Sequence, residues 1–146
     1  KYIIAGILEK ISEMTVFLNT TEDSYMRLGS KKAPEYISWS SENRSQLIRV
    51  PAAKGEFKRV ELRSPDPYAN PYLAFALIIY AGLYGIENKL LPPDSADVNM
   101  YTANEDTKSR YKNLPQSLGA AGKAALESSF INSYLPRKLV ETYCKQ

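Results

Sequence analysis

The sequence contains no histidine and only one cysteine, Cys144, among its 146 residues. Without imidazole, the chain by itself offers no Ser-His-Asp or Cys-His nucleophile system and no zinc site that needs a histidine ligand. A single cysteine forms no disulfide within the chain, which suits a reducing compartment and others as well. Any chemistry therefore falls to carboxylates, arginine, lysine, tyrosine or serine.

Neither sign of charge strongly predominates, and long apolar runs are scarce. The 19 basic and 16 acidic residues give a net charge of +3, with no basic arm, so we expect no nucleic-acid partner. The longest uncharged apolar run, Tyr72 to Ile86, is shorter than the roughly 18 residues of a membrane-span candidate. The opening residues carry charges inside their apolar stretch, unlike a signal peptide. We expect a cytoplasmic protein without membrane contact.

Periodicity and turn residues predict an α+β fold with a small sheet packed by helices. The predicted helices are 2–16, 71–88, 117–126 and 136–143, and the predicted strands are 35–40, 46–50 and 57–63. Residues 19–34 and 94–113 are predicted loops, the second with a short helix. The long helix is expected to be buried, and the expected core aromatics are Tyr36, Trp39 and Phe75. A helix that begins at the second residue is typical of a segment cut from a longer protein.

Arginine is concentrated in one part of the chain. Five of the seven arginines fall between residues 27 and 63. Alternation along the third predicted strand places Arg59, Glu61 and Arg63 on one face. Guanidinium groups bind carboxylates and phosphates bidentately, and a carboxylate such as Glu61 suits Mg²⁺. From spacing alone, a solvated strand face with alternating charges explains the pattern equally.

Two strings of residues resemble one enzyme family. The segments NRSQLIRVP (Asn43 to Pro51) and RVELRSPDPYANPY (Arg59 to Tyr72) are similar to the C-terminal half of the catalytic domain of type I glutamine synthetase, found in bacteria and archaea. The resemblance includes residues 5–15, 19–28 and 81–90, and it weakens towards Tyr101. Residues after about 102 match poorly and receive no function.

The resemblance implies a fold and an extent. The chain would be the later part of a half-open antiparallel barrel with its helices. Residues 1–146 would form the C-terminal segment of the catalytic domain, with the N-terminal domain and the upstream catalytic region absent. In the family, the other metal ligands, including a histidine, lie in that upstream region. We therefore expect the segment to be inactive alone and to self-associate through apolar surface left exposed.

The resemblance also implies roles for the phosphate site. Glu61 would bind the metal, Mg²⁺ or Mn²⁺, that bridges the nucleotide phosphates. Arg44, Arg49 and Arg59 would neutralise the phosphates of ATP, and Arg44 and Arg59 would act in catalysis by stabilising the phosphoryl group in transfer. Phosphoryl transfer needs positioning and charge neutralisation and no protein nucleophile, which suits this residue set.

The implied substrates are glutamate, ammonia and ATP. Arg27 and Arg63 would hold the carboxylates of glutamate. The γ-carboxylate would take the γ-phosphoryl group of ATP to give γ-glutamyl phosphate, and ammonia would displace phosphate to give glutamine. The family resemblance implies a homo-oligomer of twelve full-length subunits.

Two departures from the family pattern leave alternatives open. The family often carries the loop L-V-P-G-Y-E-A-P, whose glutamate helps to take a proton from ammonium. This chain has LGSKKAP (Leu28 to Pro34), one residue shorter, with Lys32 where that glutamate would fall. A cation there repels ammonium, so either Glu35 substitutes or the nucleophile is another amine, as in a γ-glutamyl-amine (polyamine) ligase of the same fold.

The second departure is at Tyr101, which occupies the position of a tyrosine that is adenylylated in some family members. The residues that follow do not continue that pattern, so an exposed or packing tyrosine is expected. A third hypothesis is a short, non-catalytic relative that binds nucleotide or partner subunits.

Overall fold

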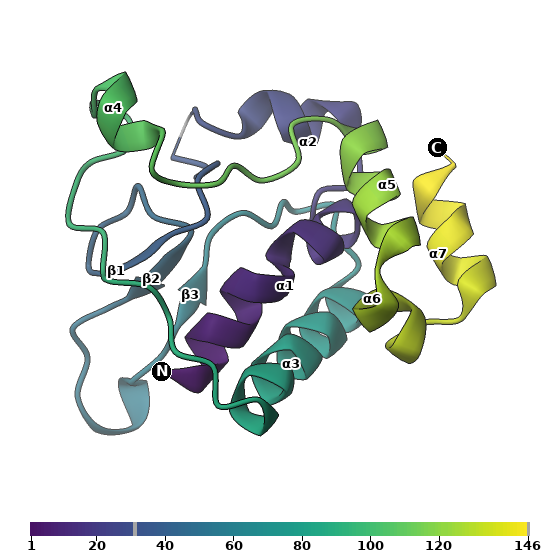
Figure 1. Cartoon of the computed structure of the whole chain (residues 1–146), viewed down its shortest axis with the longest axis horizontal. Coiled ribbons are helices and arrows are strands. Elements are labelled where there is room, and N and C mark those ends of the chain that lie inside the picture. The colour runs from purple at the N-terminus through teal and green to yellow at the C-terminus, as the bar shows by residue number, and fades with distance from the viewer. Residues whose placement is uncertain (31, 146) are drawn as a thin grey trace.

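The computed structural model describes residues 1–30 and 32–145. In chain order the elements are α1 (Tyr2–Leu18), α2 (Glu22–Arg27), β1 (Trp39–Ser41), β2 (Ile48–Val50), the 3₁₀ turn η1 (Gly55–Phe57), β3 (Glu61–Leu62), α3 (Pro71–Glu87), α4 (Glu105–Lys108), α5 (Leu118–Glu127), α6 (Ser129–Tyr134) and α7 (Arg137–Cys144). The fold is α+β, as predicted. Helices α1 and α3 lie side by side in the middle, α5 to α7 gather beside one end of this pair, and the small sheet lies on the other side of α1 (Figure 1).

Helix α1 is the centre of the core. Its apolar residues recur every three or four positions, so one face of the helix is apolar, and Ile7, Ile11 and Met14 on that face are buried. Two glycines allow its backbone to touch that of α3. A Cβ atom on Gly6 would lie 2.0 Å from the carbonyl oxygen of Ala81, and one on Gly85 would lie 2.1 Å from that of Tyr2. Only glycine permits this approach.

Helix α3 begins and ends where its sequence predicts. The side chain of Asn70 accepts hydrogen bonds from the backbone N–H groups of the next two non-proline residues, at 3.0 and 3.3 Å, and Pro71 occupies the first helical position. Its inner face, with Leu77 and Ala81, is buried against α1. Among residues 1–30 and 32–145, no helix combines the length and apolar character needed to cross a membrane.

The prediction that this helix is buried is wrong for its outer face. Phe75, an expected core residue, is 66% exposed. The exposed apolar residues of this face, which we call the α3 stripe, are Tyr72, Phe75, Ile79, Leu83 and Ile86. The helix is apolar all round, but only one face meets α1, and no described element covers the other. Of the other expected core aromatics, Tyr36 and Trp39 are half-buried.

The sheet is short and mixed. Strand β2 lies between β1 and β3, with β1 parallel and β3 antiparallel to it, so the expectation of a wholly antiparallel sheet is wrong for one pairing. Of the predicted strand 57–63, only Glu61 and Leu62 pair with β2, whereas Phe57 belongs to the exposed turn η1. Gly55 has a left-handed φ of +59°. Among the described residues, the chain after Gly55 pairs with no strand until β3, which pairs with β2.

Two short helices were not predicted. Helix α2 lies within the predicted loop 19–34 and begins with a capping box, in which Thr21 and Ser24 each bond the other's backbone N–H. Helix α6 begins at a serine cap, where Ser128 accepts from the N–H of Ile131 at 2.9 Å. The consequence for the site is that α2 ends at Arg27, so a helix rather than a loop positions this arginine.

Candidate functional site

A single carboxylate, Glu61, is bound by two arginines. Register places Arg49 of β2 directly opposite Glu61 of β3, and Arg49 Nη1 lies 2.9 Å from Glu61 Oε2. Arg59 bonds the other oxygen, Oε1, from both Nε and Nη2 at 3.0 Å. Burial raises the pKa of Glu61, but the hydrogen bonds and charges of the two guanidinium groups outweigh it and hold the pKa below its ordinary value. The shared face predicted for Arg59 and Glu61 is confirmed.

Arg63 lies beside this group. Its backbone N–H donates to the carbonyl of Leu47 at 3.0 Å, which continues the pairing with the strand segment of Arg49. Burial lowers the pKa of the Arg63 guanidinium, and the charges of Arg49 and Arg44 lower it further, while Tyr101 and Glu61 act in the opposite direction. The guanidinium stays protonated at neutral pH. Arg63, Glu61, Arg49 and Arg44, all predicted site residues, therefore lie within electrostatic reach of one another.

Arg27 reaches the same region from helix α2. Its Nη2 donates to the carbonyl of Ser64 at 2.6 Å and to Oδ1 of Asn19 at 2.9 Å. Ser64 follows Arg63 in the chain, so Arg27 is bonded to the backbone of the segment that carries Arg63.

Both arginines keep donors free for a ligand. Arg63 donates from Nη2 to the carbonyl of Lys32 at 3.2 Å, and its Nη1 is buried without a partner among the described residues. Arg27 Nε is in the same state. Those two nitrogens are covered by the chain, so a carboxylate would approach Arg27 Nη1 and Arg63 Nε, which make no hydrogen bond within the described residues and are not buried.

Arg44 completes the cluster from the turn before β2. It is exposed, and within the described part of the chain its side chain makes no hydrogen bond, although its charge acts on Arg63. Of the five arginines Arg27, Arg44, Arg49, Arg59 and Arg63, two contact Glu61 and the others come from the segments next to it, so the net charge of this group, which we call the arginine cluster, is strongly positive. Such a group binds anions and can stabilise charge that develops during phosphoryl transfer.

Glu61 could contribute one ligand to a metal ion whose other ligands come from elsewhere. Within residues 1–30 and 32–145, no three His, Cys, Asp or Glu side chains come together as a metal site. Mg²⁺ is commonly bound by one or two carboxylates, with phosphate oxygens and water as its other ligands. Glu61 alone fits that arrangement, because its Oε2 accepts one bond, from Arg49, and keeps a second lone pair.

The loop after α2 carries the residues that depart from the family pattern. Gly29 and Lys32 have left-handed φ angles of +77° and +69°, and the Gly29 N–H donates to the carbonyl of Ala33 at 2.8 Å. The side chain of Lys32 is exposed. The carboxylate of Glu35 folds back onto Gly29, where a Cβ atom would meet it at 2.7 Å. Lys31 was part of the quoted loop and lies outside the described residues.

Tyr101 is close to the same loop and is 38% exposed. It shares a small cavity with Gly29, Glu35 and Ser45. Burial raises the pKa of its hydroxyl, and the charge of Arg63 partly opposes the shift. Tyr101 therefore packs at the edge of the arginine cluster, a position that its sequence context did not indicate.

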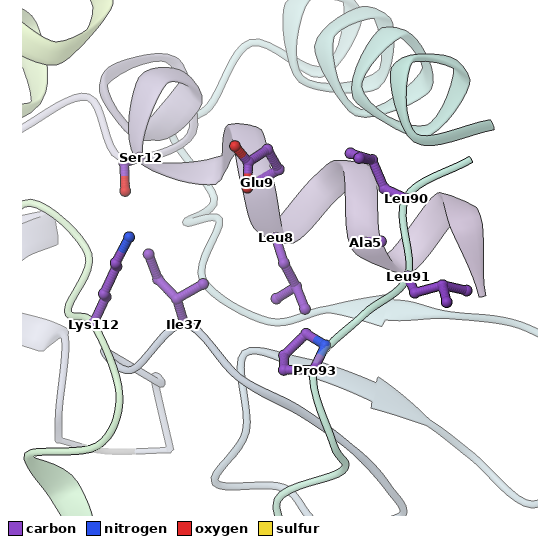
Figure 2. Close-up of a pocket in the computed structure, with 9 residues that line it drawn as sticks. All are labelled: Ala5, Leu8, Glu9, Ser12, Ile37, Leu90, Leu91, Pro93 and Lys112. Carbon is purple, nitrogen blue, oxygen red and sulfur yellow. The ribbon is translucent and has the colours of Figure 1, made fainter. Parts of the chain in front are cut away.

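A separate cavity lies away from these residues. It has a volume of about 310 Å³ and opens between α1 and the segment at Leu90 to Pro93, with Lys112 on its far side (Figure 2). Glu9 and Ser12 of α1 border it, and none of the predicted site residues does. The candidate site is therefore the arginine cluster rather than this cavity.

Comparison with known proteins decides the family. The model of the family described as "Glutamine synthetase, catalytic domain" matches residues 1–146. This chain belongs to the glutamine synthetase catalytic-domain family. The match extends over the residues after 102, to which the sequence alone assigned no function.

Curated glutamine synthetases align with nearly all of the chain. The enzyme from Methanosarcina mazei is 42% identical over 145 residues, which cover 97% of this chain and 32% of the relative. The enzyme from Thermotoga maritima is 41% identical over 146 residues, which cover 98% of this chain and 33% of the relative. The chain thus spans about a third of the length of the curated glutamine synthetases it matches.

Solved structures of a protein named GmaS share the fold. A complex of GmaS with ADP superposes with a TM-score of 0.85 at 31% identity, over 99% of this chain and 34% of the other. GmaS without ligand gives a TM-score of 0.83 at 32% identity, over 99% and 32% of the two chains. The glutamine synthetase fold is therefore preserved across the whole described chain.

Proposed function

We propose that this chain is the C-terminal segment of the catalytic domain of a longer ATP-dependent ligase that joins ammonia to glutamate. One observation carries the proposal: Glu61 is held between Arg49 and Arg59, beside Arg63, in a chain of the glutamine synthetase family. The complete protein would act in the cytoplasm as a ring of twelve subunits. This segment would supply arginines and one metal ligand, and the rest of the site would come from other parts of the protein.

The phosphate half of the site follows from charge. Arg44, Arg49 and Arg59 would bind the phosphates of ATP and stabilise the negative charge of the γ-phosphoryl group as it moves to the γ-carboxylate of glutamate. Glu61 would hold Mg²⁺ or Mn²⁺, which supplies further charge neutralisation when bound. Pairing with two guanidinium groups keeps Glu61 ionised and fixes its direction, which a metal ligand requires.

The carboxylate half of the site is formed by Arg27 and Arg63. The two side chains are anchored to the backbone carbonyls of Ser64 and Lys32, and Arg27 Nη1 and Arg63 Nε, which are neither bonded nor buried, would bind the carboxylates of glutamate. With both substrates held, ammonia would attack the carbonyl carbon of γ-glutamyl phosphate, and the departing phosphate would carry away the electron pair of the broken C–O bond.

Lys32 favours a second candidate, a γ-glutamyl-amine ligase. The loop places a lysine where the family's glutamate would assist ammonium, and the acid nearest to it in sequence, Glu35, is folded against Gly29. A lysine does not attract ammonium and does not accept its proton at neutral pH. The departure at this position leaves open a nucleophile other than ammonium, whose proton a group elsewhere in the complete protein would accept.

The test begins with the intact mass of the polypeptide made from the native gene, followed by an assay of that polypeptide with ATP and glutamate. Glutamine and phosphate formed from ammonium support the first candidate, and a strong preference for a polyamine supports the second. Absence of turnover with every amine contradicts both. The 146-residue chain alone is expected to release no phosphate.

One variant tests the role of the arginine cluster. Arg59→Ala is expected to lower turnover at least about 100-fold, because it removes a charge that stabilises the transferring phosphoryl group. The fold should survive, since the Arg59 side chain is 53% exposed. Lys58→Ala is the matched control, because Lys58 is an exposed neighbouring cation and should leave turnover nearly unchanged. Unfolding of the Arg59 variant, or equal losses in both variants, contradicts the assignment.

A further inference from the structure

Arg27 and Arg63 come from segments that are distant in sequence. Arg27 is the last residue of α2, and Arg63 follows β3. Two arginines serve one small ligand only if their separation is fixed, since a misplacement of about 1 Å can be costly in a binding or catalytic site. The contacts of Arg27 with Ser64 and Asn19 are made by the guanidinium itself, which must also face the ligand. A separate link must therefore hold α2 against the segment after β3.

Asp66 makes that link. Its carboxylate oxygen Oδ2 accepts a hydrogen bond from the hydroxyl of Ser24, a buried residue in the middle of α2. Its other oxygen, Oδ1, accepts from the backbone N–H of Tyr68 at 2.8 Å. Its own backbone N–H donates to the carbonyl of Leu18, the last residue of α1, at 3.0 Å. One residue thus joins α1, α2 and the segment that carries Arg63.

The contacts of Asp66 indicate that it positions neighbouring segments through hydrogen bonds rather than through an ion pair. Within residues 1–30 and 32–145, Asp66 takes part in no salt bridge. It is half-buried and borders, with Arg27, Ser24 and Tyr68, an open cavity of about 180 Å³. Because this space is open to solvent, truncation of Asp66 leaves no sealed void in the core, and the variant should fold.

We propose that Asp66 is a positioning residue for substrate binding: through Ser24 it fixes α2, and with it Arg27, at the distance from Arg63 that the carboxylates of glutamate require. This proposal rests on the proposed function, which assigns glutamate to these two arginines. Asp66 touches neither arginine through its side chain, so its effect is indirect. The charge-assisted bond to a buried hydroxyl is the stronger kind of hydrogen bond and gives the link its stiffness.

The test uses the full-length polypeptide of the native gene and the variants Asp66→Ala, Asp66→Asn and Asp23→Asn. In Asp66→Ala, KM for glutamate should rise about tenfold, the loss expected when a displaced Arg27 no longer makes one charge-assisted hydrogen bond to glutamate, while KM for ATP and the melting temperature change little. Asp66→Asn keeps an oxygen acceptor and should recover most of the loss. Asp23→Asn is the matched control, because Asp23 is an exposed carboxylate on the same helix, next to Ser24.

The outcomes separate this proposal from the one beneath it. Active wild-type protein with an unchanged KM for glutamate in Asp66→Ala overturns the positioning role and leaves the proposed function standing. A rise in both KM values together with a lower melting temperature also overturns it, because a merely structural residue behaves so. Wild-type protein without ligase activity refutes the proposed function, and the positioning role fails with it. A selective rise in KM for glutamate, recovered by asparagine, supports the proposal.

Discussion

Replacement of Gly6 by alanine tests the contact on which the core depends. In α1, a Cβ atom at this position would lie 2.0 Å from the carbonyl oxygen of Ala81 and 2.6 Å from the backbone nitrogen of Gly85, whereas real Cβ contacts are essentially never below 3.0 Å. Both obstacles are helical backbone, which has no rotamer to change. The α1 and α3 backbones must therefore separate locally by about 1 Å, and the packing of the buried residues between them must loosen.

The expected cost of this change is larger than the ordinary benefit of alanine. Overpacking in a rigid core lowers the free energy of unfolding by about 1–3 kcal/mol, and a clash with backbone atoms belongs to the upper end of this range. The helix propensity of alanine returns at most about 1 kcal/mol. The variant should therefore lose about 2 kcal/mol of unfolding free energy. For a chain of this size, that corresponds to a fall in melting temperature of about 6 °C.

Thermal and urea unfolding, followed by circular dichroism, measure the effect. Gly119→Ala is the matched control, because Gly119 is also helical but has no atom within 4 Å of the added Cβ. This control should melt at or slightly above the temperature of the unmodified chain. If Gly6→Ala melts within about 1 °C of the control, the backbone contact between α1 and α3 is not as close as described, and the reasoning is refuted.

Two further predictions concern charge and exposed surface. Glu61 should titrate below its ordinary pKa of 4.5 in a ¹³C NMR titration, and Arg59→Ala should raise that pKa. Because the pKa is depressed in the folded protein, the stabilisation from this ion pair is present at neutral pH and is lost as the pH falls through the folded value. A titration midpoint at or above 4.5 contradicts the geometry. The chain should self-associate through the α3 stripe, as measured by sedimentation velocity. Ile79→Lys or Leu83→Lys should reduce this self-association, whereas the control Ala120→Lys, at an exposed position of α5, should not. A monomer at all concentrations contradicts the prediction.

The main helices could be predicted because their signals are local. The apolar spacing of residues 3 to 14 predicts α1, and the Asn70 cap followed by Pro71 predicts the start of α3. The α2 capping box lies in a stretch rich in polar residues and glycine, and this composition favoured a loop. Part of the site was also local: alternation along a strand placed Arg59 and Glu61 together, and the structure confirms that contact.

Cross-strand register and burial depend on partners elsewhere in the chain. No periodicity within one strand indicates that Arg49 faces Glu61, because that pairing follows from how β2 and β3 meet. The apolar run of α3 predicts a helix, but which of its faces is covered depends on what packs there.

The sequence by itself determined the main helices α1, α3, α5 and α7, the family and which residues are candidate site arginines, since each of these follows from residue type and spacing along the chain. Only the tertiary structure decided that Arg27 bonds the carbonyl of Ser64, that Asp66 bonds Ser24 of α2, and that the α3 stripe is exposed. These contacts join segments tens of residues apart through hydrogen bonds to backbone atoms and side chains. Every residue has a backbone carbonyl, so the sequence pattern alone does not show which one an arginine will bind.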